Sequence, residues 1–288
     1  MEKVERLFAV RNCLGEGALW NAAQQKLYWL DIIGQKYFCY HPATGAMESF
    51  DFGLLVSVMR FTQSGRMVMA TEGGFKFWDP LTRIFTPIAN PEQGKPGSRF
   101  NDGAIDPQGR FWAGTMSPDP TSSLYRMDAD LSIHKMDTRI GVSNGTGWSP
   151  DGRTMYFTDS ATHTIYAYDF DPATGNIAHR RIFSQTLDEP GTPDGLAVDR
   201  DGFVWSASWG GWKVNRYDPD GKKEREIPMP VEFPTSCAFG GDDLTDLYIT
   251  TAWVELGEER KETQPWAGDL FRLHTEIKGK PEPFFAGS

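Results

Sequence analysis

A polar residue opens a short, mostly apolar run at six places along the chain, and each time it stands eight residues before a turn. The polar residues are Glu16, Ser57, Asn101, Asn144, Asp194 and Thr235. A large apolar residue follows four positions later in every copy, namely Trp20, Phe61, Ile105, Trp148, Val198 and Phe239. The runs are short and rich in aromatic and branched residues, and no long stretch has helical periodicity. The pattern therefore predicts an all-β chain.

Each copy contains three strand signals separated by residues that form turns. In the third copy NDGAID is followed by RFWAGTM and then by LYRMDAD, and similar triplets occur in the other five copies. Asp-Pro, Asp-Gly and Thr-Gly pairs mark the turns because these residues adopt turn conformations readily. A fourth strand in each copy is expected from the more variable outer segments.

The copies repeat every 41 to 50 residues, counted between successive polar positions. This period matches one blade of a β-propeller. Six copies predict a single domain over residues 1–288, folded as a six-bladed β-propeller. Because the ring must close, residues 4–10 or residues 283–286 should complete the sheet of the last blade. A two-domain sandwich is the competing fold, but it gives no reason for an eight-residue offset that recurs six times.

Charge and composition narrow the possible partners. The formal net charge is −10 and Lys and Arg form no clusters, which disfavours nucleic-acid binding. The opening MEKVERLFAV carries charges where a signal peptide has an apolar core, and no apolar run of about 18 residues occurs, so no membrane association is expected. Three cysteines without a CxxC motif favour a reducing, cytoplasmic setting. A monomer is the default expectation.

The six polar residues predict a site at one mouth of the propeller channel. The first strand of every blade lines the channel, so the starts of these strands gather around one axis. Two carboxylates, two amides and two hydroxyls then converge, and all of them offer oxygen atoms. Such a set suits a divalent cation, namely Ca²⁺, Mg²⁺ or Mn²⁺, although carboxylates also accept Zn²⁺ or Fe²⁺. The alternative is that these residues only hydrate a water-filled channel.

Arg99 stands two residues before Asn101, on the same face of the expected strand. In this position a guanidinium could hydrogen-bond substrate hydroxyls or stabilise a developing oxyanion. A structural salt bridge with Asp102 or with a carboxylate of a neighbouring blade is the competing interpretation.

Several motifs together resemble one known family. LGEGALW, SRFNDGAIDPQGRFWAGTM, SNGTGWSPDGRTMYFTDS and PDGLAVDRDG are similar to segments of the regucalcin (senescence marker protein), gluconolactonase and luciferin-regenerating family, and the likeness runs from residue 14 to about residue 268. The resemblance implies a six-bladed propeller that holds one divalent metal ion and hydrolyses sugar lactones.

The resemblance also implies a role for individual residues. Glu16, Asn144 and Asp194 match the metal ligands of the family, and Asn101 and Arg99 match its substrate-binding residues. Asp194 is also the expected general base for the attack of water on the lactone carbonyl. Because a ligand carboxylate is a weak base, metal-bound hydroxide is the alternative.

This chain departs from the family pattern in one loop. Mammalian members carry a longer insert after the GTM motif, with a glutamate that contacts substrate, whereas GTMSPDPTSSLYR is short and contains no glutamate. That contact cannot be transferred, although Asp119 could partly replace it. The short loop is consistent with a more open site.

Two other functions compete with lactone hydrolysis. One is a non-enzymatic calcium-binding regulatory protein. The other is a paraoxonase-like esterase, which is disfavoured because no histidine occurs among the six polar positions. The particular lactone and the metal ion are not predicted.

Overall fold

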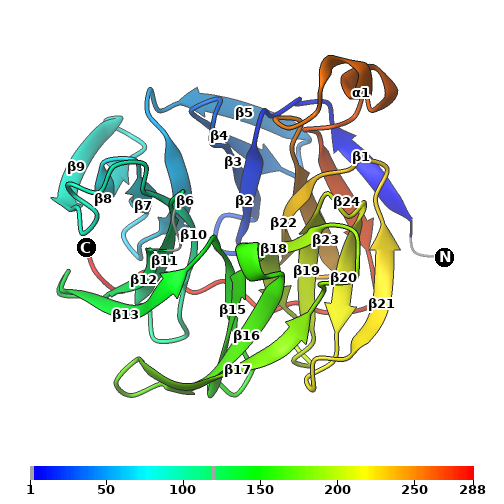
Figure 1. Cartoon of the computed structure of the whole chain (residues 1–288). Helices are drawn as coiled ribbons and strands as arrows, with labels where there is room; N and C mark the ends of the chain where they lie inside the picture. Colours follow the sequence, from blue (N-terminus) through cyan, green and yellow to red (C-terminus); the bar gives the residue numbers. More distant parts are fainter. Residues whose placement is uncertain (1–2, 119–120) are drawn as a thin grey trace.

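The computed structural model describes residues 3–118 and 121–288. Six four-stranded antiparallel sheets are arranged as the blades of a propeller (Figure 1). The prediction of an all-β, six-bladed propeller is confirmed. Each inner strand contacts the inner strands of both neighbouring blades, so the ring is closed.

The strands of each blade follow in chain order from the channel outward, except in the last blade. Blades one to three consist of β2 (Gly15–Asn21), β3 (Lys26–Asp31), β4 (Lys36–His41) and β5 (Ala46–Asp51); β6 (Val56–Phe61), β7 (Met67–Thr71), β8 (Gly74–Asp79) and β9 (Ile84–Ala89); and β10 (Arg99–Ile105), β11 (Phe111–Met116), β12 (Ser122–Met127) and β13 (Ile133–Ile140). Blades four to six consist of β14 (Ser143–Trp148), β15 (Thr154–Asp159), β16 (Thr164–Asp171) and β17 (Asn176–Gln185); β18 (Thr192–Val198), β19 (Val204–Trp209), β20 (Lys213–Tyr217) and β21 (Lys223–Pro228); and β22 (Pro234–Gly240), β23 (Asp246–Thr251), β24 (Leu270–His274) and β1 (Val4–Phe8).

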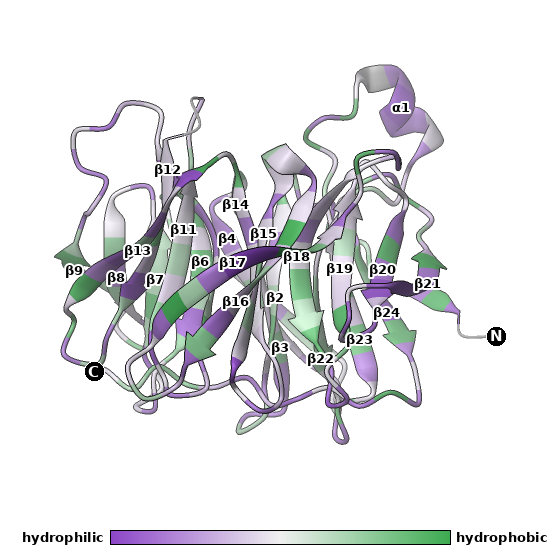
Figure 2. Ribbon diagram, turned by 60° about the horizontal axis from the view of Figure 1, so that its bottom comes forward, coloured by the Kyte–Doolittle hydropathy of each residue, from purple (hydrophilic) through white to green (hydrophobic). Residues whose placement is uncertain are grey.

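Helical structure is limited to two short segments in the described part of the chain. The 3-10 helix η1 (Ser160–Thr162) follows β15, and the α-helix α1 (Glu258–Thr263) lies between β23 and β24. Figure 2 shows α1 protruding from one face of the ring. No helix among the described residues has the length and apolarity needed to cross a membrane.

The N-terminal strand closes the ring. β1 is the outermost strand of the sixth blade and pairs antiparallel with β24, with Val4 opposite Leu273. Of the two segments expected to complete this sheet, the N-terminal one does so.

The repeated apolar residues pack between blades. All six residues that follow the polar positions are buried, with at most 7% of their surface exposed: Trp20, Phe61, Ile105, Trp148, Val198 and Phe239. The outer strands β13 and β17, in contrast, are largely exposed and hydrophilic (Figure 2). The core therefore lies in the layers between neighbouring sheets.

The C-terminal segment crosses to the second and third blades. The Phe285 N–H donates to Phe61 O at 2.8 Å, and the Ala286 N–H donates to Gly109 O at 2.9 Å. The Phe285 ring is fully buried, in one cluster with Phe77 and Phe111. This segment ties the end of the chain to two blades.

Replacing Phe285 with alanine should destabilise the protein by about 3 to 5 kcal/mol, because it leaves a cavity among packed rings. The free energy of unfolding in urea would measure the effect. As a control, Leu81→Ala changes a side chain that is 93% exposed and should cost less than about 0.5 kcal/mol. Equal stability of the two variants would contradict a structural role for the segment.

Candidate functional site

A cavity of about 360 Å³ lies where the inner strands begin. All five residues predicted for the site line it: Glu16, Arg99, Asn101, Asn144 and Asp194. They come from blades one, three, four and five, far apart in the sequence. The fold thus brings the predicted residues to one place, and their individual roles remain predictions.

A local irregularity of the sheet accompanies each polar position. In all six blades the pairing between the first and second strands shifts register at or directly beside the polar residue, for example between Phe100 and Asp102 around Asn101. Such bulges change the direction of a side chain and end the regular ladder. At Asn101, Asn144 and Asp194 the regular alternation of side chains between the two faces of the sheet is therefore interrupted. The bulge, and not the strand period, sets the orientation of these side chains.

The two hydroxyl residues do not line the cavity. Ser57 Oγ donates to Phe100 O at 2.7 Å, and Thr235 Oγ1 donates to Gly15 O at 2.6 Å. Each bond joins the inner strands of adjacent blades, and both residues are buried. The expectation that two hydroxyls complete the ring of oxygen donors was therefore wrong, because these short side chains stabilise the ring of blades instead.

Three of the predicted residues offer oxygen atoms suited to a cation. Asn144 Nδ2 donates to Ser160 Oγ at 3.0 Å, so the amide is oriented, while its Oδ1 is buried without a hydrogen-bond partner. Asp194 Oδ1 is likewise buried and unpartnered. Glu16 Oε2 accepts a hydrogen bond from the Gly17 N–H at 2.9 Å. Buried acceptors rarely stay unpaired, and carboxylate and amide oxygens are ligands for hard divalent ions. The donor set therefore fits a divalent metal ion.

The described residues contain no group of three or more His, Cys, Asp or Glu side chains placed to share an ion.

Buried negative charge dominates the electrostatics of the site. Burial, reinforced by the charge of Asp102, raises the pKa of Glu16 to about 8. The pKa of Asp194 lies well above its ordinary value, because of burial first and then the charges of Glu16 and Asp102. Burial also raises the pKa of Asp102, against the lowering effect of Arg60. Without a cation, the protein therefore disfavours full ionisation of these carboxyl groups.

The metal-free protein should lose stability as the pH rises from about 5 to about 8. The pKa of Glu16 is raised from 4.5 to about 8, so the folded state retains a proton that the unfolded chain releases, and this contribution is lost as the pH passes through the folded pKa. One proton changes the free energy of unfolding by at most about 1.4 kcal/mol per pH unit. The melting temperature of EDTA-treated protein would show the decline, and Glu16→Gln should make it shallower without removing it, because the pKa of Asp194 is raised as well. A melting temperature that rises over this interval would contradict the electrostatic account.

Arg99 lines the cavity and forms no ion pair with a described carboxylate. Its Nη1 donates to Asn101 Oδ1 and to Phe100 O, both at 3.0 Å, and Asn101 Nδ2 donates to Ser143 O at 2.9 Å. Within the described residues Arg99 has no carboxylate oxygen within 4.0 Å. The expected alternative of a salt bridge with Asp102 is not found. Arg99 therefore orients Asn101 and keeps its cationic group at the cavity.

A buried carboxylate that the sequence patterns did not single out holds the segment that precedes Arg99. Glu92 accepts hydrogen bonds from Lys95 Nζ at 2.5 Å, from Ser98 Oγ and from the Tyr125 hydroxyl. It thereby ties the segment that leads into β10 to strand β12 of the same blade. Asp119, the loop residue considered as a substrate contact, lies outside the described residues.

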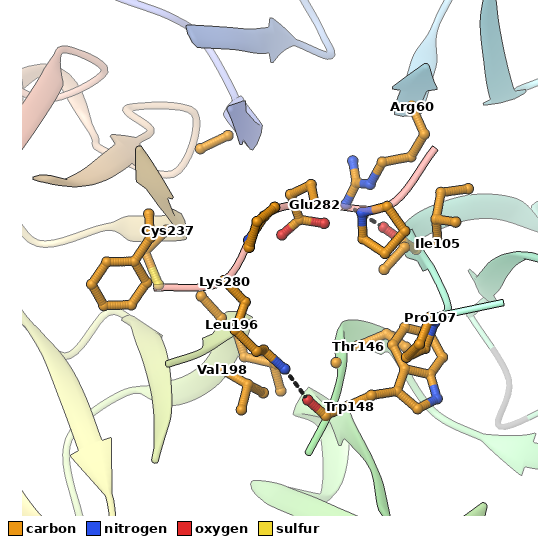
Figure 3. A pocket seen from close by; sticks show the side chains of 18 of the residues that line it. Arg60, Ile105, Pro107, Thr146, Trp148, Leu196, Val198, Cys237, Lys280 and Glu282 are labelled. Carbon is orange, nitrogen blue, oxygen red and sulfur yellow. Dashed lines mark hydrogen bonds between the residues drawn. The ribbon is translucent and has the colours of Figure 1, made fainter. Parts of the chain in front are cut away.

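A second cavity, of about 210 Å³, occupies the other half of the channel (Figure 3). The later residues of the inner strands line it together with the C-terminal segment, and Lys280 Nζ donates to Trp148 O at 2.5 Å. Asp102 and Arg60 line this cavity and not the first one. Sequence reasoning missed Asp102 as a channel residue because it directly follows Asn101, where strict alternation would point it away.

Comparisons with known proteins give a consistent result. Residues 14–253 match the family described as "SMP-30/Gluconolactonase/LRE-like region". The chain is 37% identical to regucalcin of Danio rerio over 292 residues, which cover 99% of both chains. It is 36% identical to pentonolactonase XacC of Haloferax volcanii over 283 residues, or 93% of both chains. Among solved structures it is similar to the calcium-binding protein regucalcin of Agrobacterium tumefaciens, with a TM-score of 0.94, 29% identity, and coverage of 99% of this chain and 97% of that one.

Proposed function

Because the chain belongs to the SMP-30/gluconolactonase/LRE-like family, we propose that it is a lactonase that hydrolyses a sugar lactone to the corresponding aldonic acid. One observation carries the proposal. The cavity gathers Glu16, Asn144, Asp194, Arg99 and Asn101, in a chain that aligns over 93% of its length with a pentonolactonase.

The proposed metal ligands are Glu16, Asn144 and Asp194, holding one divalent ion (Ca²⁺, Mg²⁺, Mn²⁺, Zn²⁺ or Fe²⁺). The buried, unpartnered oxygens of Asn144 and Asp194 support this assignment, as does the similarity to a calcium-binding protein. When bound, the ion would supply Lewis-acid polarisation of the lactone carbonyl.

The side chains of the cavity would bind the substrate and transfer a proton from the attacking water to the leaving ring oxygen. Arg99 and Asn101 would hydrogen-bond the lactone and orient its carbonyl carbon toward Asp194. Asp194 would accept a proton from the attacking water, and the proton would then pass to the ring oxygen as the carbon–oxygen bond breaks. The product is an open-chain acid with a new hydroxyl group. The guanidinium of Arg99 would stabilise negative charge that develops on the carbonyl oxygen.

A pH-indicator assay on a panel of five- and six-carbon aldonolactones tests the proposal. Acid release well above the spontaneous opening of the lactones is expected with at least one of them. No release with any lactone and metal, combined with tight metal binding, would favour a calcium-binding regulatory protein. A preference for aryl esters would favour a paraoxonase-like esterase, although no histidine is among the residues that line the cavity.

The expected partner is the small sugar lactone. A cytoplasmic monomer that binds neither nucleic acid nor membrane remains a prediction. The free thiols of Cys13, Cys39 and Cys237 are compatible with a reducing compartment.

A further inference from the structure

Glu255 contributes a carboxylate to the rim of the cavity that is not part of the proposed catalytic group. It lies between β23 and α1 on the sixth blade, and its side chain is exposed. The other two carboxylates of the cavity, those of Glu16 and Asp194, are less exposed than Glu255 and are assigned to the metal.

The position of Glu255 relative to the predicted substrate residues is informative. Arg99 and Asn101 are on the third blade, and in a six-bladed ring the third and sixth blades lie opposite each other. Much of the wall between them is apolar and includes Ile33 and Val142. A lactone whose carbonyl oxygen is held by Arg99 and Asn101 would therefore extend its far carbons across the cavity toward Glu255.

Several contacts hold Glu255 in place. Trp209 Nε1 donates to Glu255 Oε2 at 3.3 Å, and the Trp209 ring packs against Phe233 with 4.5 Å between ring centroids. The main chain is fixed as well, because Arg260 Nη2 donates to Glu255 O at 3.0 Å. The preceding Val254 N–H donates to Cys13 O at 3.1 Å. The carboxylate is thus presented from a tethered loop and oriented by an indole N–H.

We propose that Glu255, oriented by Trp209, accepts hydrogen bonds from the hydroxyl groups of the lactone that lie farthest from its carbonyl. It thereby selects uncharged polyhydroxy lactones over lactones with a phosphate or sulfonate on the last carbon. A carboxylate can only accept hydrogen bonds, so hydroxyl donors satisfy it, whereas an anionic substituent is repelled. The inference rests on the proposed lactonase function and specifies the substrate class of the same cavity.

Two substitutions separate the acceptor role from the charge. Glu255→Ala should raise KM for the best neutral lactone of the panel roughly tenfold with little change in kcat, since charge-assisted hydrogen bonds to a distal hydroxyl act on binding. Glu255→Gln keeps an acceptor of the same shape and removes the charge. The inhibition constants of gluconate and 6-phosphogluconate, measured against hydrolysis of that lactone, then isolate the charge. Wild type should bind gluconate more tightly than 6-phosphogluconate. Glu255→Gln should change the ratio of the two inhibition constants about tenfold in favour of 6-phosphogluconate.

A matched control is Glu259→Gln, which removes an exposed carboxylate on α1 outside the residues that line the cavity. It should leave KM and the inhibition ratio unchanged. Trp209→Phe keeps an aromatic ring beside Phe233 but loses the indole N–H that binds Glu255, and should reproduce part of the Glu255→Ala effect. If wild type hydrolyses a lactone while Glu255→Ala and Glu255→Gln behave like Glu259→Gln, the role of Glu255 is wrong and the lactonase proposal stands. If wild type hydrolyses no lactone, both are wrong.

Discussion

Replacing Asp194 with alanine is expected to lower kcat/KM for lactone hydrolysis by roughly three orders of magnitude, as for the loss of a general base. The same change should weaken metal binding, because Asp194 Oδ1, like Asn144 Oδ1, is a buried oxygen of a proposed metal ligand that has no hydrogen-bond partner. The pH-indicator assay measures the first effect, and titration calorimetry with the activating ion measures the second.

A stability measurement distinguishes this result from misfolding. The pKa of Asp194 is raised by burial and by the charges of Glu16 and Asp102, so removing the carboxyl group should leave the metal-free protein at least as stable as before. The control is Asp201→Ala, which removes an exposed carboxylate from a turn of the same blade and should keep full activity. An Asp194→Ala protein that retained most of its turnover would show that the site has been assigned to the wrong residues.

Removal of divalent ions is expected to abolish turnover. Glu16 and Asp194 both line the cavity, and burial raises the pKa of each, with the charge of Glu16 raising that of Asp194 further, so a bound cation is expected to stabilise the two carboxylates as anions. Protein stripped with EDTA should be inactive, and adding back Ca²⁺, Mg²⁺, Mn²⁺, Zn²⁺ or Fe²⁺ one at a time should identify the ion that restores activity.

Glu16→Gln provides the matched test of the metal assignment. It preserves shape and removes one ligand charge, so the concentration of ion needed for half-maximal activity should rise at least tenfold. Activity that survives exhaustive stripping, verified by elemental analysis, would rule out metal dependence while leaving lactone hydrolysis open.

The repeat predicted the architecture well because it reflects the geometry of a blade. The eight-residue offset fixes where an inner strand begins relative to its turn, and all six buried partners, from Trp20 to Phe239, lie between blades as the pattern requires. The sequence pattern gives two candidates for the strand that closes the ring, because the segments at residues 4–10 and 283–286 are both short and both able to form a strand. Only tertiary pairing with β24 decides between them.

The site was predicted less completely. Glu16, Asn101, Asn144 and Asp194 reach the cavity because each is the polar residue at an inner-strand start. Ser57 and Thr235 occupy the same register, but a hydroxyl close to its backbone can satisfy a carbonyl of the next strand, and both do.

Residues outside the repeat carried no comparable signal. Glu92 and Glu255 lie in loops, where no periodic pattern marks a residue. Only the fold shows that Glu255 lines the cavity and that Glu92 binds the segment before Arg99. Asp102 depends on the bulge at Asn101, which the apolar pattern does not encode.

The pairing of β1 with β24 has a consequence for biosynthesis. Arg6 Nε donates to Asp269 Oδ2 at 2.7 Å across 263 residues of sequence, so β1 cannot pair with β24 until all the residues between them have left the ribosome. Domains usually fold from the N-terminus as they emerge, and contacts between distant residues slow folding. Here the nascent chain must keep β1 unpaired until β24 has been synthesised. A message truncated before the codons for β24 would release a product with an open sheet edge, the kind of surface that recruits other chains.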